Sequence, residues 1–389
     1  MPTLRSRGIA LVLALAALPL AAVGCDTSDS EAVDRTAALE TYADIAAASY
    51  QDSYDAAVAL DQAIDAFVAA PSEAGFEAAK EAWLAAREPY GQTEAYRFAN
   101  GPIDDADGPE GLLNAWPLDE SYVDYVEGDP DAGVINRPEE FPTVDQDLIL
   151  ELNEQGGEEN VSAGYHAVEF LLWGQDLSAA GNGDRPFTDY TTAANADRRR
   201  QYLAAASDLL LVHLQEMVDA WEAGAAGNYR QEFLALDEDQ ALRNVFTGIG
   251  TLAKSELAVE RMFVAVSNQD QEDEHSCFSD NTHRDIVTNA QGIANVWRGS
   301  YARTGGATVS GTSLADLVRA EDEALADRID ANVAAALAAV DAIPAPFDQA
   351  IINDQETVIA AVDALQTLGD SFVEGARALG VQVNNELPD

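Results

Sequence analysis

Apolar residues recur every three to four positions through most of the chain that follows residue 31, which is the spacing of a helix with one buried face. Residues 32–68 form the first such stretch, and the Pro-Ser pair after it predicts a helix end and a new helix start. The second stretch covers residues 72–98, in which Pro89 predicts a kink. Residues 101–142 are rich in proline and break the pattern, so we expect only short helical pieces there.

Two shorter helical patterns, residues 143–153 and 162–173, precede a polar segment rich in Gly, Asn and Asp. This segment, residues 181–192, predicts a domain boundary. Long helical patterns follow it, at residues 195–223, 237–268, 282–303, 313–343 and 353–379. No alternating apolar run is long enough to predict a sheet. The chain is therefore predicted to be all-α, with two packed helical-bundle domains at residues 32–180 and 193–389.

The first residues have the pattern of an export signal. Arg5 and Arg7 precede an apolar run at residues 9–23, and small residues follow it, which predicts a secretory signal peptide over residues 1–24. The chain is therefore expected to be exported.

The cleavage point coincides with Cys25, in an Ala-Val-Gly-Cys order that resembles the lipobox of bacterial lipoproteins. We expect Cys25 to carry lipid and residues 25–31 to form a tether, so that lipid holds the protein on a membrane of the cell envelope, facing the periplasm or the cell surface. Plain secretion is the alternative. With Cys25 lipidated, Cys277 is the one remaining thiol, and no intrachain disulfide can form.

The chain is strongly acidic, with 69 Asp and Glu against 21 Lys and Arg and a formal net charge of −48. The acids are spread along every segment, which indicates a dispersed acidic surface. We interpret it as adaptation to a saline environment, where salt screens the self-repulsion; attraction of cations to a metal site is the alternative. Repulsion from phosphates excludes nucleic acid as a partner.

The apolar run at residues 164–174 contains His166 and Glu169. At helical spacing these two side chains share one face, where they can bind one metal ion or form a hydrogen-bonded pair. A histidine with satisfied hydrogen bonds in a protein core is the alternative.

Two further segments carry candidate chemistry. In the first, Arg87, Glu94 and Arg97 fall near one helix face, which fits either an interhelical salt-bridge layer or a stripe that faces a metal.

The second of these segments, residues 272–285, holds two of the four histidines, His275 and His283, with Asp280 and Cys277 between them. A metal role for His275, Asp280 or His283 is one interpretation, and helix capping and loop stabilisation is the other. Cys277 lacks the paired spacing of a zinc knuckle.

Three segments together resemble the imelysin family. They are the GxHxxE motif of Gly164, His166 and Glu169, the stretch from Arg87 through Glu94 to Asp104, and the HSCFSDNTH stretch at residues 275–283. The resemblance covers nearly the whole chain after the signal peptide and is strongest to the iron-regulated branch. It implies a two-domain helical-bundle fold in an exported, often lipid-anchored bacterial protein that works with iron-uptake machinery.

The family is also classed as a metallopeptidase. A hydrolytic zinc needs three protein ligands, an open position for water and a separate base, whereas HxxE supplies two ligands and no HExxH or HxxEH occurs. Glu94 is the first choice for a third ligand, with His275 or His283 behind it, and Arg97 or Asp104 would support the ligands. One nitrogen with two carboxylates suits iron, and zinc is also accommodated.

The sequence therefore leaves three hypotheses for the function. The first is a membrane-tethered protein that binds iron for uptake or handover, through His166, Glu169 and Glu94. The second is a zinc peptidase that uses the same residues. The third is a helical binding module without metal, in which His166 and Glu169 form a buried polar pair. Whether the protein is an enzyme is left open.

Overall fold

The computed structural model describes Met1 and residues 33–106, 108–178 and 181–387. Apart from Met1, the predicted signal peptide and tether lie outside the described residues, and so does Cys25. Among the described residues, no helix combines the length and the apolar character that a membrane crossing needs.

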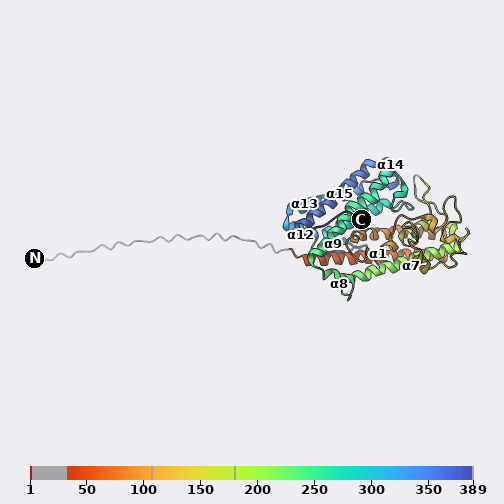
Figure 1. Ribbon diagram of the computed structural model, residues 1–389, viewed down its shortest axis with the longest axis horizontal. Coiled ribbons are helices and arrows are strands. Elements are labelled where there is room, and N and C mark those ends of the chain that lie inside the picture. Colours follow the sequence, from red (N-terminus) through yellow and green to blue (C-terminus); the bar gives the residue numbers. More distant parts are fainter. Residues whose placement is uncertain (2–32, 107, 179–180, 388–389) are drawn as a thin grey trace. The chain divides into compact units, whose positions relative to one another are not determined.

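A first group of helices packs around α1 (Arg35–Ala69), which contacts both α2 (Glu73–Thr93) and α7 (Ala196–Trp221). Figure 1 shows α1 and α7 running alongside each other. Asp34 and Ser72 accept hydrogen bonds from free backbone N–H groups in the first turns of α1 and α2, which fixes where both helices begin.

A second group packs around α15 (Gln355–Ala378), which contacts α9 (Glu238–Thr251), α13 (Glu323–Asp341) and the π-helix η4 (Leu252–Phe263). In Figure 1, α13 and α15 lie side by side. Helix α11 (Thr282–Arg298) contacts α13 in this group and α2 in the first group, so it joins the two.

The remaining elements are short. They are η1 (Glu94–Tyr96), α3 (Glu110–Leu113), α4 (Glu120–Val123), η2 (Val134–Asn136), α5 (Gln146–Leu152), α6 (Gly164–Trp173), η3 (Phe187–Tyr190), α8 (Tyr229–Leu234), α10 (Val264–Asn268), η5 (Gln271–Asp273), β1 (Ser300–Ala302), β2 (Thr308–Ser310), α12 (Leu314–Glu321) and α14 (Phe347–Asn353).

The all-α prediction is confirmed, with local differences. The helix expected over residues 282–303 ends at Arg298, because Gly299 adopts a left-handed conformation, and β1 then pairs with β2 in a small antiparallel hairpin. The helix expected over residues 313–343 is interrupted where Asp322 leaves the helical conformation and caps α13.

Helices on both sides of the predicted boundary at residues 181–192 pack together, since α7 contacts α1 and α6. The division into two domains therefore stays a prediction.

Helix α6 carries the GxHxxE motif, and all ten of its residues are buried. Gly164 has a φ of +84°, and a Cβ there would lie 2.8 Å from the Leu113 carbonyl oxygen. Only glycine therefore allows the backbone conformation with which α6 begins. Gly174 ends the helix with a φ of +73°. The Trp83 indole N–H and the Tyr202 hydroxyl donate hydrogen bonds to backbone carbonyls in and just before the first turn of α6. These contacts fix the position of the helix in the core.

Candidate metal centre

His166 and Glu169 lie one turn apart on α6, and both side chains are fully buried. His166 Nδ1 is 2.8 Å from Glu169 Oε2. The other carboxylate oxygen, Oε1, accepts hydrogen bonds from the Ser279 backbone N–H at 3.0 Å and from the Ser279 hydroxyl at 2.6 Å. Both oxygens of Glu169 therefore have partners within the protein.

The burial of this pair disfavours charge on either member. Burial raises the pKa of Glu169 to about 8, although the Ser279 hydrogen bonds act in the opposite direction. Burial also lowers the pKa of His166 well below its ordinary value, with smaller contributions from His275 and Arg87. The His166 imidazole is therefore neutral at physiological pH, which is the form that binds metals.

The second ring nitrogen of His166, Nε2, is buried and has no hydrogen-bond partner among the described residues. The His166 ring contacts the rings of Trp116 and His275, whose centroids lie 5.0 Å and 4.6 Å from its own. A buried nitrogen without a partner is uncommon in native proteins and requires an explanation. Metal-binding histidines typically bond a carboxylate through one nitrogen and keep the other for the metal.

His275 is the second imidazole at this position. Its Nε2 lies 3.4 Å from Asn114 Nδ2, and its Nδ1 lies 3.5 Å from Asp285 Oδ2 without hydrogen-bond geometry. Burial, and then the positive charge of Arg261, lowers its pKa to about 4, against the effect of Asp285. The structure thus brings together two neutral imidazoles that the sequence placed in separate segments.

A buried ion pair between Arg87 and Asp285 lies beside His275. The Arg87 guanidinium donates to both carboxylate oxygens of Asp285 at 3.1 and 3.0 Å, and to Asn114 Oδ1 at 2.6 Å. Burial alone would raise the pKa of Asp285, but Arg87 outweighs it and holds that pKa well below its usual range. Because Asn114 Oδ1 accepts from Arg87, its Nδ2 is the atom turned toward His275. Arg87 therefore orients a neighbour of the imidazole pair.

Glu94, the predicted third ligand, is buried in a network of ion pairs. Its Oε2 lies 2.6 Å from Arg261 Nη2 and 3.4 Å from Arg97 Nη1. Burial would raise its pKa, but Arg261 and then Arg97 overcome that effect and hold the pKa at about 2. Arg97 also lies 3.4 Å from Asp104. Glu94 is thus charged and already paired, and its role as a metal ligand stays a prediction.

Asp280 and His283 have other surroundings. The charges that act on Asp280 are those of Asp348 and Asp176, and those that act on His283 are Arg284 and Asp341. None of these four residues belongs to the group around His166. Metal roles for Asp280 and His283 also stay predictions.

The neighbouring Cys277 is buried and is a free cysteine in the described part of the chain.

Several residues around the two imidazoles have no signal in the sequence. Asn114 and Trp116 come from the proline-rich stretch without periodicity, and Arg261 lies in an ordinary helical pattern on η4. Asp285 is the last residue of the segment 272–285 that the sequence analysis singles out, two positions after the HSCFSDNTH stretch.

The sequence contains a second HxxE pattern, formed by His213 and Glu216 of α7. His213 Nδ1 is 3.5 Å from Glu216 Oε1, but the Glu216 side chain is exposed. The spacing alone therefore does not produce a buried pair.

In the described part of the chain, no three His, Cys, Asp or Glu side chains are close enough together to hold a metal ion as they stand. The unpartnered Nε2 of His166 fits a metal. Glu169 and Glu94 are occupied by protein hydrogen bonds and ion pairs, and the two nitrogens of His275 face Asn114 and Asp285. The arrangement suits a metal ion that the protein binds as cargo and that keeps some oxygen ligands of its own, such as water.

A cleft of about 600 Å³ opens beside this group, and His275, Asn114, Trp116 and Arg261 are among the residues that line it. His166 does not reach the cleft wall but lies behind Trp116 and His275.

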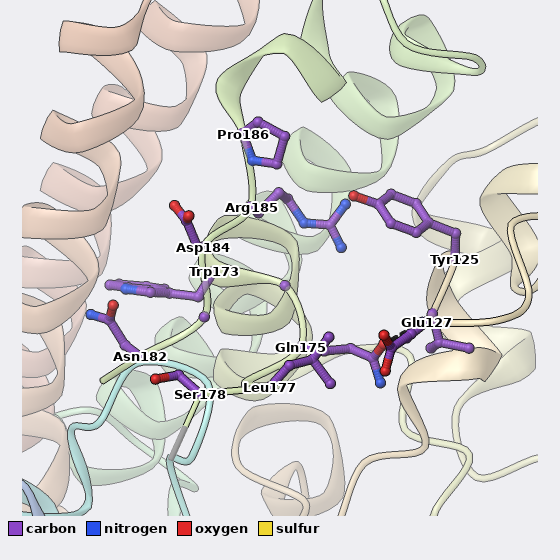
Figure 2. A pocket seen from close by; sticks show the side chains of 13 residues that line it. Tyr125, Glu127, Trp173, Gln175, Leu177, Ser178, Asn182, Asp184, Arg185 and Pro186 are labelled. Carbon is purple, nitrogen blue, oxygen red and sulfur yellow. Dashed lines mark hydrogen bonds between the residues drawn. The ribbon is translucent and has the colours of Figure 1, made fainter. Parts of the chain in front are cut away.

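A separate pocket of about 380 Å³ lies beyond the end of α6, and Figure 2 shows Trp173 and Arg185 in its lining. The Arg185 guanidinium is paired with Asp124 at 2.6 Å and Asp189 at 3.2 Å. It therefore joins the loop after α6 to the end of α4 and to η3.

The family model described as imelysin (peptidase M75) matches residues 46–372. Iron-regulated protein A of Synechococcus elongatus is 26% identical over 335 residues, which cover 82% of this chain and 81% of that protein.

Two solved structures have the same fold. One, described as an iron-regulated protein A precursor from Parabacteroides distasonis, has a TM-score of 0.70 at 21% identity and covers 88% of this chain and 94% of its own. The other, an imelysin-like protein from Psychrobacter arcticum, has a TM-score of 0.62 at 14% identity, with 89% and 98% covered.

Proposed function

The chain belongs to the imelysin family, and on that premise we propose that it binds iron at the cell envelope, for uptake or for handover to another component. The name of the Synechococcus relative, iron-regulated protein A, supports iron as the metal. The signal-peptide pattern and Cys25 support export and a lipid anchor.

The observation that carries this proposal is the unpartnered Nε2 of His166. Glu169 accepts from Nδ1 when the carboxylate is charged, so that Nε2 keeps its lone pair free for a metal. Because burial raises the Glu169 pKa to about 8, the pair holds an additional proton at neutral pH, and a metal at Nε2 would displace it. In this assignment Glu169 orients the ligand, and His275 is the nearest second nitrogen donor.

The peptidase alternative requires a carboxylate that can activate water. Both oxygens of Glu169 are engaged by His166 and Ser279, and Glu94 is paired with Arg261. No observation in the described residues favours hydrolysis over binding, so we assign the site to binding.

Metal analysis tests the proposal. The purified protein, incubated with iron and desalted, is compared with His166→Ala and with His213→Ala, which removes an imidazole of equal size from the second HxxE pair. We expect the wild type and His213→Ala to retain bound iron, and His166→Ala to retain at least tenfold less. Circular dichroism confirms that all three proteins are folded.

Equal iron content in all three proteins would contradict the proposal. So would peptide hydrolysis that depends on His166 and is abolished by a chelator, because it would favour the zinc peptidase.

A further inference from the structure

The cleft beside His275 is lined largely by carboxylates. Seven acidic residues contribute to its wall, and we call it the acidic cleft: Glu110, Glu154, Glu158, Glu256, Glu260, Glu272 and Asp273. Among the described residues, its one imidazole is that of His275, which is only 6% exposed. The Nε2 of His275 faces Asn114 at 3.4 Å, and its Nδ1 makes no hydrogen bond but lies 3.5 Å from Asp285 Oδ2. The cleft thus joins an anionic lining to a buried imidazole in its wall.

The positive charges of the cleft are already committed. In the part of the chain that the structure describes, two basic residues line it, Arg97 and Arg261. Arg261 is paired with Glu94 at 2.6 Å and with Glu256 at 2.9 Å. Arg97 is paired with Glu110 at 3.1 Å as well as with Glu94. Neither guanidinium is free to receive an anionic ligand.

Most of the negative charge of the cleft is uncompensated. Five of the seven acidic residues form no ion pair with a described basic residue: Glu154, Glu158, Glu260, Glu272 and Asp273. They come from two separate parts of the chain, the loop after α5 and the segment from η4 to η5. A cleft lined by one sign of charge focuses the field and raises the local concentration of the opposite ion.

The inner wall of the cleft completes the argument. His275 forms part of this wall, and the His166 ring lies against it with the two ring centroids 4.6 Å apart. The buried Nε2 of His166 has no hydrogen-bond partner among the described residues. A hydrated cation is attracted by the carboxylates and can then exchange water for imidazole nitrogen. An anionic chelate, or a haem with its two carboxylates, meets repulsion over the same path and finds no free guanidinium.

We infer that the cargo of this site enters through the acidic cleft as a free, hydrated metal cation and not as an anionic chelate or haem. This inference rests on the proposed function. It names the form of the metal and the residues that select it.

The experiment compares two forms of iron and two charge variants. Binding of Fe²⁺ under anaerobic conditions and of ferric citrate is measured from the quenching of tryptophan fluorescence, since Trp116 lies beside both imidazoles. The cleft variant is Glu158→Gln with Glu260→Gln. The control variant, Glu356→Gln with Asp363→Asn, removes the same charge from exposed positions of α15 that have no ion pair with a described residue.

We expect the wild type to bind Fe²⁺ and not ferric citrate. The cleft variant should associate with Fe²⁺ roughly three- to tenfold more slowly than the control variant in dilute buffer, and the difference should fall below about twofold in 1 M salt. Equal association rates in the two variants in dilute buffer would overturn the inference. Binding of ferric citrate alone, still dependent on His166, would overturn it while leaving the proposed function intact. If neither form of iron binds the wild type, the proposed function itself fails.

Discussion

His166 Nδ1 lies 2.8 Å from Glu169 Oε2, and this contact decides which imidazole nitrogen is left for a metal. The second oxygen of Glu169 is held by Ser279, from a loop 110 residues farther along the chain. In this structure the carboxylate of HxxE therefore holds the histidine in place, which is the hydrogen-bonded pair that the sequence left open beside two ligands of one metal ion.

Glu169→Gln should weaken metal binding without unfolding the protein. The amide can still accept from Ser279 through its oxygen, but its NH₂ donates to His166 Nδ1, so the ring proton moves to Nε2 and blocks the metal position. We expect iron affinity to fall about 10- to 100-fold, measured by titration of the purified variant. Unchanged affinity would show that the proton position on His166 is irrelevant.

The same variant gives a pH-dependent stability difference. Burial raises the Glu169 pKa to about 8, above its value in the unfolded chain, so the wild type loses stability as pH rises from about 4.5 to 8. Gln cannot ionise, so the Glu169→Gln variant does not lose this stability as pH rises. The melting temperature of metal-free Glu169→Gln relative to wild type should therefore rise over that pH window, and a constant difference would contradict the assignment.

Arg87→Lys should destabilise the fold much more than Arg284→Lys. Both arginines bond a carboxylate through two nitrogens across the α2–α11 contact, Arg87 to Asp285 and Arg284 to Glu88. The first pair is buried, whereas both side chains of the second are more than 40% exposed. Since lysine cannot reproduce the two-pronged contact, we expect a loss of about 3 kcal/mol for Arg87→Lys and under about 1 kcal/mol for Arg284→Lys in urea unfolding. Similar losses would show that burial of the pair is unimportant.

Gly164→Ala should cost more stability than Gly224→Ala. Both glycines have a positive φ near +80°, so both substitutions carry backbone strain of about 1 kcal/mol. Only at Gly164 does the added Cβ also approach a backbone oxygen, at 2.8 Å from Leu113, while nothing lies within 4 Å at Gly224. We expect Gly164→Ala to lose at least about 2 kcal/mol and to weaken iron binding, because α6 must shift. Equal losses at the two positions would mean that α6 can move without cost.

Glu94→Gln should reduce stability at neutral pH, with an effect that disappears in acid. Arg261 and Arg97 hold the Glu94 pKa at about 2 against burial, below the unfolded value of about 4.5. A lowered pKa contributes stability above the unfolded pKa, and that contribution is lost as pH falls through the folded pKa. We expect a deficit of roughly 3 kcal/mol at pH 7 that begins to shrink below about pH 4.5, checked by urea unfolding at several pH values. A deficit that stays constant down to pH 3 would contradict the Arg261 contact.

The sequence by itself determined the local secondary structure of this protein. Apolar spacing located the long helices, and the positions of His166 and Glu169 on one face of α6 follow from helical geometry, which depends only on residues a few positions apart. For the same reason the sequence placed Arg87, Glu94 and Arg97 near one helix face. The structure shows an ion pair between Glu94 and Arg97, whereas Arg87 pairs with Asp285.

Only the tertiary structure decided what each group contacts. The pairing of Glu169 with Ser279, of Arg87 with Asp285 and of Glu94 with Arg261 joins segments more than 100 residues apart. Such contacts depend on how helices pack, and α7 lies against α1 although a predicted boundary separates them in the sequence. Burial, which makes both imidazoles neutral and leaves the His166 Nε2 without a partner, is likewise a property of the packed chain.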